Sequence, residues 1–259
     1  MQPIPNTDHL APRALCSATI RTGTAAWSIP REHAAPFPMA GSHLERYGAV
    51  FNAVEINSSF YRPHRLATYE RWAASVPEDF RFAVKVPKAI THEHRLENVS
   101  DLLDRFLSEA GGLGPKLGPL LVQMPPSLSF QPDIANQFLS ELRSKVEGSI
   151  ACEPRHASWF TPEVETLLVE LRIARVAADP APVPGADEPS GWRGLSYYRL
   201  HGSPRIYYSA YSPEYLSAVA GLLTRNVAAA VETWCIFDNT AAFAATGDAL
   251  TTKDLVQAS

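Results

Sequence analysis

The chain has 259 residues, of which 46% are hydrophobic, 19% charged and 10% aromatic. This apolar content is enough for a large core and excludes a disordered or coiled-coil chain. The 23 basic and 27 acidic residues give a formal net charge of −4, so we expect neither nucleic acid nor a membrane as a partner. The length is close to the roughly 250 residues of an eightfold α/β barrel, which favours one large domain.

The N-terminal segment contains three prolines and no apolar run long enough for a signal peptide or a membrane span. We therefore predict a disordered leader over residues 1–17 and a single barrel domain over residues 18–259. The cysteines are odd in number and widely spaced, at Cys16, Cys152 and Cys235. This pattern is typical of neither a disulfide framework nor a cysteine zinc site, and it favours a cytoplasmic location.

Short apolar segments rich in β-forming residues recur along the chain and are separated mostly by stretches with helical periodicity. They cover residues 18–23, 53–56, 82–86, 120–124, 150–152, 175–178, 197–200 and 234–237. Their centres lie about 23 to 38 residues apart, which is the spacing of a strand plus a crossover helix rather than of hairpins. Eight such units predict an α/β fold of the TIM-like (β/α)8 barrel type.

Several helix starts are marked by capping residues. Ser100 precedes apolar residues at helical spacing, and we predict that it caps that helix. A second helix is expected from Asp133, and two more after Thr161-Pro162 and Ser212-Pro213. Between the sixth and seventh strands, residues 180–194 contain four prolines and three glycines, so the sixth crossover is expected to be irregular.

Alternation along the strands predicts which side chains point into the barrel. In residues 53–57, Val54 and Ile56 suit the layer facing the helices, which leaves Glu55 and Asn57 pointing inward. The same reasoning places a polar side chain inward near the end of most other strands, or just beyond it. These residues are Lys85, Gln123, Glu153, Arg155, Asp179, Arg199, His201 and Asp238.

All of these polar residues lie late in their strands, where barrel enzymes build their active sites. At any single position a structural ion pair is an equally good interpretation. Across seven strands, however, the pattern favours a pocket with mixed charge. Arginine offers a fork to phosphate or carboxylate, while carboxylates act as acid, base or hydroxyl acceptor. We therefore expect a small polar substrate with an anionic group, carbohydrate-like or nucleotide-like.

The expected roles divide into proton transfer and substrate binding. The candidate proton-transfer residues are Glu55, Glu153, His201 and His92. The candidate substrate-binding residues at the strand ends are Asn57, Lys85, Gln123, Arg155, Asp179, Arg199 and Asp238. Loop aromatics expected to wall the pocket mouth are Trp27, Tyr61 and Trp159. No serine or cysteine stands in a nucleophile motif, so covalent acyl chemistry has no support.

Two further interpretations stay open at this stage. A metal-dependent phosphoesterase would use Glu55, Glu153, Asp179 and His201 as ligands for a divalent ion, although the sequence requires no cofactor. A non-catalytic module would bind a metabolite at the barrel mouth without changing it. The sequence does not distinguish a hydrolase from a lyase or an isomerase, and it does not give the oligomeric state.

The ordered series of strand-end motifs resembles the bacterial domain of unknown function 72 family, the YecE-like proteins. The motifs include Val54 to Tyr61, Leu117 to Ser127, Glu153-Pro154-Arg155 and Arg199-Leu200-His201-Gly202. The resemblance covers nearly the whole chain and implies a TIM-like barrel, but no settled activity. The family usually has Gly-Thr-Ser-Gly-Trp where this chain has Gly23-Thr24-Ala25-Ala26-Trp27, and Phe-Asn-Asn where it has Phe237-Asp238-Asn239.

Overall fold

The computed structural model describes residues 19–258, so the leader predicted over residues 1–17 lies outside the described residues. The strands are β1 (Ile20–Thr24), β2 (Ala53–Ile56), β3 (Arg81–Lys85), β4 (Leu117–Gln123), β5 (Ile150–Glu153), β6 (Ile173–Arg175), β7 (Ala177–Asp179), β8 (Ser190–Gly191), β9 (Leu195–Leu200) and β10 (Glu232–Phe237). The helices are α1 (His43–Gly48), α2 (Ser58–Tyr61), α3 (Leu66–Ala74), α4 (Ser100–Ala110), α5 (Pro132–Lys145), α6 (Pro162–Glu170), α7 (Pro213–Ala228) and α8 (Ala244–Gln257). Short helical turns are η1 (Arg31–His33), η2 (Ala89–Glu93), η3 (Gly111–Lys116) and η4 (Ala157–Trp159).

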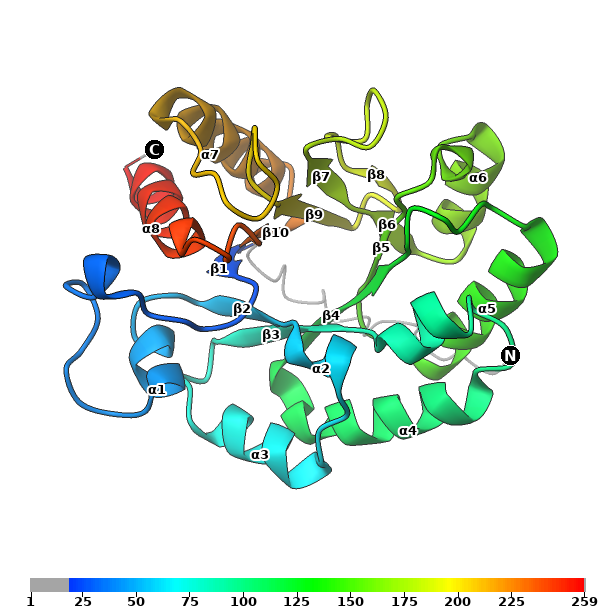
Figure 1. The fold of residues 1–259 in the computed structure, drawn as a ribbon, viewed down its shortest axis with the longest axis horizontal. Coiled ribbons are helices and arrows are strands. Elements are labelled where there is room, and N and C mark those ends of the chain that lie inside the picture. Colours follow the sequence, from blue (N-terminus) through cyan, green and yellow to red (C-terminus); the bar gives the residue numbers. More distant parts are fainter. Residues whose placement is uncertain (1–18, 259) are drawn as a thin grey trace, which may run out of the picture.

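The strands form two ladders, β1-β10-β9-β7 and β2-β3-β4-β5-β6, with β8 antiparallel on the edge of β6. Between β6 and β7, the Val176 N–H donates to the Cys152 carbonyl of β5 at 2.9 Å. On the other side, Ala25 bridges Glu55, and the Ala26 N–H donates to the Glu55 carbonyl at 2.9 Å. The strands therefore follow one another around a TIM-like barrel with the helices outside (Figure 1), as the sequence predicts.

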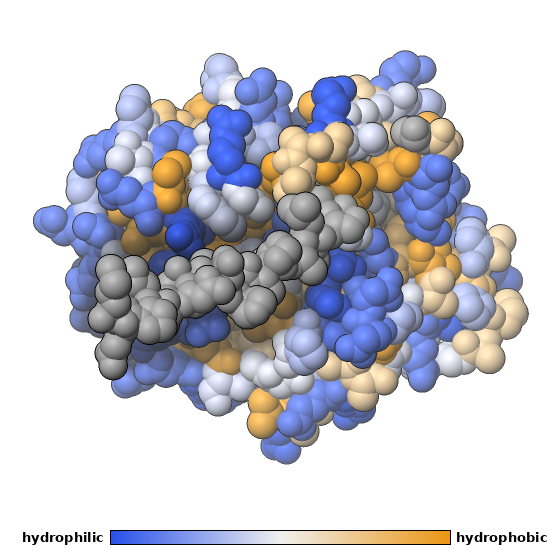
Figure 2. Space-filling model, turned by 180° about the vertical axis from the view of Figure 1, so that it is seen from behind, coloured by the Kyte–Doolittle hydropathy of each residue, from blue (hydrophilic) through white to orange (hydrophobic). Residues whose placement is uncertain are grey.

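The sixth unit departs from the regular repeat. The strand expected over residues 175–178 is divided into β6 and β7, and residues 180–194 contain β8 but no helix. The irregular crossover is thus confirmed, while the expected continuous strand is wrong. Within residues 19–258 no helix combines the length and the apolar character needed to cross a membrane. On the face shown in Figure 2, hydrophilic residues surround smaller hydrophobic patches.

The predicted helix caps are confirmed at two positions and wrong at one. The Thr161 hydroxyl accepts a hydrogen bond from the Val164 N–H, and the Ser212 hydroxyl accepts one from Tyr215. At α4, however, the N-cap position is Val99, and Ser100 is the first helical residue. The Ser100 hydroxyl donates to Glu141 of α5 instead. Helix α5 begins at Pro132, next to the expected Asp133.

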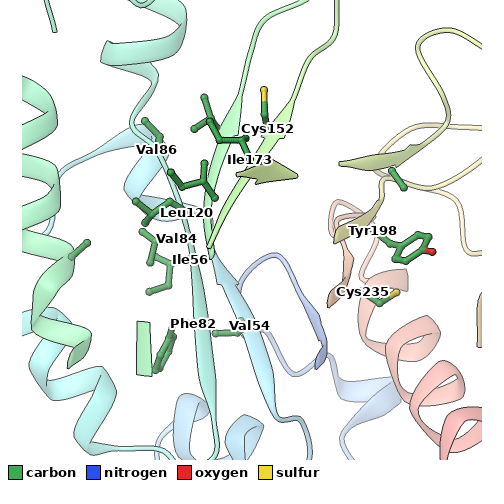
Figure 3. Packing of buried hydrophobic residues seen from close by; sticks show 14 of the residues in the cluster. Val54, Ile56, Phe82, Val84, Val86, Leu120, Cys152, Ile173, Tyr198 and Cys235 are labelled. Atoms are coloured by element: carbon green, nitrogen blue, oxygen red, sulfur yellow. The ribbon is translucent and has the colours of Figure 1, made fainter. Parts of the chain in front are cut away.

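The core has an outer layer between strands and helices and an inner layer inside the barrel. The outer layer contains Val54, Ile56, Phe82, Val84, Val86 and Leu120 (Figure 3), as alternation predicts. The inner apolar layer is built from small residues and two stacked rings, Tyr197 and Trp234, whose centroids are 6.0 Å apart. A Cβ at Gly118 would lie 2.7 Å from the Trp234 ring, so only glycine leaves room for it.

Candidate functional site

Arg199 lies at the centre of a buried ionic network at the carboxyl ends of the strands. Its guanidinium, which is fully buried, is 2.8 Å from Glu55 of β2, 3.2 Å from Glu153 of β5 and 3.0 Å from Asp238 after β10. These side chains meet from different sides of the barrel. The inward orientation predicted for all of them therefore brings them together at one end.

The charges of this network are fixed by the ion pairs. Burial alone would raise the pKa of Glu153, but Arg155 and Arg199 outweigh it and hold the pKa well below its ordinary value. Burial likewise opposes ionisation of Asp238, and Arg199 and His201 overcome it, so its pKa is lowered. Burial would lower the pKa of Arg199, yet the carboxylates raise it well above its ordinary value. Glu153, Asp238 and Arg199 thus stay charged at neutral pH.

Two neutral side chains complete the hydrogen bonds of the carboxylates. The Tyr197 hydroxyl donates to Glu55 Oε2 at 2.9 Å, and Gln123 Nε2 donates to Glu153 Oε2 at 3.2 Å. Gln123 was an expected site residue, whereas Tyr197 was not. The same alternation could have found it, because Tyr197 lies two residues before Arg199 and shares its inward face.

His201 links the carboxylates on the other side of the network. Its Nδ1 is 3.0 Å from Asp238 Oδ2, and its Nε2 is 2.9 Å from Glu153 Oε1. Arg155 Nη2 lies 2.6 Å from the same Glu153 oxygen. His201 is fully buried, and the ring of Tyr207, which is 43% exposed, packs edge-on against it at 5.7 Å. Tyr207 therefore separates His201 from solvent.

Lys85 differs from the other cations of the site. It is only 4% exposed, and its Nζ makes no hydrogen bond or ion pair with any residue in the described part of the chain. The ammonium lies 4.0 Å from the centroid of the Phe60 ring. Burial and then Arg199 lower the pKa of Lys85 to about 8, although Glu55 and other carboxylates act in the opposite direction. Lys85 can therefore exchange a proton near neutral pH.

His92 lies next to Lys85 through the same aromatic ring. Its imidazole packs edge-on against Phe60 at 4.9 Å, and its Nδ1 is 2.8 Å from the Thr91 hydroxyl. Burial and the charge of Lys85 lower the pKa of His92. Lys85, expected from the sequence as a binding cation, and His92, expected as a proton-transfer residue, thus both contact the Phe60 ring.

Two buried polar atoms near the network have no hydrogen-bond partner within residues 19–258. They are Oδ1 of Asn57, at the start of α2, and Nε of Arg155, after β5. A buried acceptor or donor without a partner is costly. These two atoms therefore lack the partners that buried polar groups normally have.

The other expected site residues lie outside the ionic network. Asp179 accepts a hydrogen bond from the Tyr211 hydroxyl at 2.7 Å. Trp27 packs edge-on against Trp72 of α3, with ring centroids 5.1 Å apart. Tyr61 is 67% exposed on α2. None of these three residues makes a hydrogen bond or an ion pair with the carboxylates of the network.

Trp159 is a correction to the expected pocket wall. It is fully buried, and its indole N–H donates to the Leu128 carbonyl at 2.9 Å. Its ring packs edge-on against Phe130. The residue therefore belongs to the hydrophobic core beside η4. Its position in a loop could not reveal this, because the path of a loop depends on distant residues.

The network does not have the geometry of a metal site. The space between Glu55, Glu153 and Asp238 holds the Arg199 guanidinium, and Asp179 is bound to Tyr211 instead. Across residues 19–258 no group of three or more His, Cys, Asp or Glu side chains is arranged to hold a metal ion. The ligand set of the metal-dependent alternative is thus not assembled.

Comparison with known proteins gives the family. The family model described as "Protein of unknown function DUF72" matches residues 21–259. The chain belongs to the DUF72 family. It is 31% identical over 173 residues to the UPF0759 protein YecE of Escherichia coli K12, an alignment that covers 64% of this chain and 61% of YecE. It is 28% identical over 156 residues to YunF of Bacillus subtilis 168, covering 55% and 53%. The resemblance inferred from the motifs is confirmed.

Solved structures of other DUF72 proteins have the same fold. The protein from Enterococcus faecalis V583 superposes with a TM-score of 0.76 at 22% identity, over 93% of this chain and 99% of that one. The protein from Thermotoga maritima MSB8 gives 0.74 at 24% identity, over 92% and 99%. The 3-keto-D-glucoside 4-epimerase YcjR of E. coli gives 0.54 at 11% identity, over 93% and 99%, which shows a shared barrel alone.

This DUF72 chain departs from the family pattern described above at Ala25, Ala26 and Asp238, and two of these departures bear on the site. Ala26 has a φ of 84°, a left-handed conformation, where the family pattern has glycine. Asp238 has a carboxylate where the pattern has asparagine, and that carboxylate contacts both Arg199 and His201. The first departure strains the backbone, and the second adds a negative charge to the network.

Proposed function

We propose that this DUF72 protein is an enzyme that transfers protons to or from a small polar, anionic substrate at the carboxyl end of the barrel. The observation that carries the proposal is the unpaired ammonium of Lys85, a residue that is only 4% exposed and whose pKa is lowered to about 8. Acid–base groups work best when their pKa lies near the working pH, and strongly perturbed lysines are typical of functional sites.

The proposal changes the roles expected for the carboxylates. Because the pKa of Glu153 is held well below its ordinary value, Glu153 is a weak base and has no proton to donate at neutral pH. We assign proton transfer to Lys85 and His92. The carboxylates of Glu55, Glu153 and Asp238 hold the Arg199 side chain in place, and those of Glu153 and Asp238 also hold His201. The polar groups of Glu55, Arg199 and His201 are already engaged in hydrogen bonds and ion pairs within the network, so we assign these residues to support of the site and not to contact with the substrate.

The chemistry of the substrate follows from the groups that lack partners. Lys85 Nζ and Arg155 Nε can both donate to an anionic oxygen of a phosphate or carboxylate. The Oδ1 of Asn57 would accept a hydrogen bond from a hydroxyl group. A carbohydrate-like or nucleotide-like molecule with an anionic group has both features. The free, buried thiols of Cys152 and Cys235 support a cytoplasmic location for this reaction.

The test is a screen of phosphorylated and carboxylated sugars and nucleotides, monitored by proton NMR in D2O. Turnover appears as a new product or as deuterium at a substrate carbon. We expect turnover to be lost in Lys85→Met and kept in Lys88→Met, which changes a half-exposed lysine paired with Glu93. The rate should depend on pH with an inflection near 8 in wild type.

Two outcomes would overturn the proposal. Full turnover in Lys85→Met would remove Lys85 from the reaction. A ligand that binds wild type, binds Lys85→Met weakly and is never changed chemically would show a metabolite-binding module instead of an enzyme.

A further inference from the structure

A cavity lies on the outer side of the barrel, lined by residues of α2, η2 and α4. Its volume is about 190 Å³. Its walls are aromatic and aliphatic, and they are formed by Phe60, Tyr61, Pro87, Ile90, Leu102 and Phe106. Neither the ionic network nor the proposed substrate groups line this cavity.

The size and lining of the cavity suit one aromatic ring. An apolar cavity of about 150 Å³ accepts benzene, so this one has room for a ring and one small substituent. The rings of Phe60 and Tyr61 pack edge-on at 5.0 Å, and Tyr61 is 67% exposed. A ligand ring can pack against them in an offset or edge-on arrangement.

The charges at the rim indicate the substituent. Lys88 pairs with Glu93 at 3.0 Å, and Arg105 pairs with Glu109 at 2.9 Å, so these charges compensate one another. Arg62, which also lines the cavity, makes no side-chain hydrogen bond or ion pair with the residues described. Its guanidinium can form a forked pair with a carboxylate.

We propose that this cavity binds a small aryl carboxylate, with its ring on Phe60 and Tyr61 and its carboxylate on Arg62. The site is separate from the proposed substrate site and requires no catalysis. Phe60 nevertheless belongs to both, because the Lys85 ammonium lies 4.0 Å from the centroid of its ring. A ligand here would contact the side chain that packs on the proposed proton-transfer group.

Benzoate is the probe for this site, and benzamide, which has no charge, is its control. Calorimetric titration of the full chain should show saturable benzoate binding, with benzamide at least about tenfold weaker, a difference of about 1.4 kcal/mol. Arg62→Gln should also weaken benzoate binding by about tenfold. Leu102→Trp, which fills the cavity, should abolish it. Arg71→Gln on α3, an exposed arginine outside the cavity, should leave binding unchanged.

The proposal fails if benzoate shows no saturable binding to wild type. It also fails if Arg62→Gln binds benzoate as tightly as wild type does. Arg62 is exposed, so this substitution leaves the fold intact. Amide NMR spectra establish whether Leu102→Trp is folded. Lys85→Met should still bind benzoate, so failure of the acid–base proposal and failure of this one are distinguishable.

Discussion

At the end of β3, Lys85 is only 4% exposed, and its charged ammonium has no hydrogen-bonded partner among the described residues. Lowering its pKa from 10.5 to about 8 costs the folded state about 3 kcal/mol at pH 7. We predict that Lys85→Met raises the free energy of unfolding by up to about that amount while turnover is lost. Between pH 8 and 10.5 the unfolded chain binds more protons at Lys85 than the folded chain does. Wild type therefore becomes more stable as the pH rises through that range, and the stability advantage of Lys85→Met disappears.

Urea denaturation of both proteins at pH 7 and pH 10 measures this difference. Equal stabilities at pH 7, or an advantage that is just as large at pH 10, would contradict the lowered pKa. Lys88→Met, at a half-exposed position, serves as the control and should change stability little at either pH.

Ala26 is one of several non-glycine residues with a left-handed backbone conformation, and it lies next to the site. Its φ of 84° is readily adopted by glycine and costs other residues about 1–2 kcal/mol. We predict that Ala26→Gly raises the melting temperature by roughly 2–4 °C. Ala25→Gly is the matched control. Ala25 is buried and bridges Glu55 of β2, so glycine there should destabilise the protein. A lower melting temperature for Ala26→Gly would show that its methyl contacts outweigh the strain.

Asp238 tunes the proton affinity of Lys85. Its carboxylate is among the charges that raise the pKa of Lys85 against the effect of burial. We predict that Asp238→Asn, which restores the asparagine of the family pattern, lowers the pKa of Lys85 below about 8. An NMR titration of the lysine side chains reports this directly. The exposed Asp187→Asn provides the comparison, and a pKa that stays the same or rises in Asp238→Asn would contradict the assignment.

Among the elements, the sixth crossover depends on one side chain from α6. Glu165 accepts hydrogen bonds from Arg175 of β6 at 2.6 Å, from the Ser190 hydroxyl at 2.6 Å and from the Gly191 N–H at 2.7 Å. This carboxylate thus adds to the antiparallel pairing of β6 with β8, in a segment that has no crossover helix of its own.

We predict that Glu165→Ala lowers the free energy of unfolding by about 2–3 kcal/mol, because Arg175 and Gly191 lose a charged partner. Hydrogen exchange should accelerate mainly in residues 173–191. Glu170→Ala, at the exposed end of the same helix, should leave both measurements near wild type. Uniformly faster exchange throughout the barrel would mean that Glu165 supports the whole fold and not this crossover.

The sequence predicted side-chain positions more accurately in strands than in loops. The inward direction of Glu55, Glu153 and Arg199 follows from alternation alone, since strand geometry fixes where each side chain points. Trp159 and Trp27 follow strands, but their positions depend on contacts with Leu128 and Trp72, which lie far away in the chain. No local pattern encodes those contacts.

For the whole molecule, the spacing of apolar segments predicted the barrel, because each unit needs a strand and a covering helix. It did not predict the division of the sixth strand into β6 and β7. It also did not show that the charged end is mostly inaccessible to solvent. That closure depends on Tyr207 and neighbouring loop residues, whose positions are set by tertiary packing.

The barrel interior is apolar at one end and ionic at the other, and the ionic end makes the stability of the whole molecule depend on pH. Arg199 compensates three buried carboxylates. We predict that Arg199→Met lowers the free energy of unfolding by about 3–5 kcal/mol at pH 7, because those carboxylates become unpaired.

In wild type the pKa values of Glu153 and Asp238 are lowered, so their contribution is present at neutral pH and is lost as the pH falls through these values. In Arg199→Met the same carboxylates can be neutralised by protons at higher pH. The difference between the two proteins should therefore shrink between pH 7 and pH 4 in urea denaturation. Arg193→Met, at an exposed position, should show no such trend. A difference that is constant with pH would mean that Arg199 stabilises the barrel by packing and not by its charge.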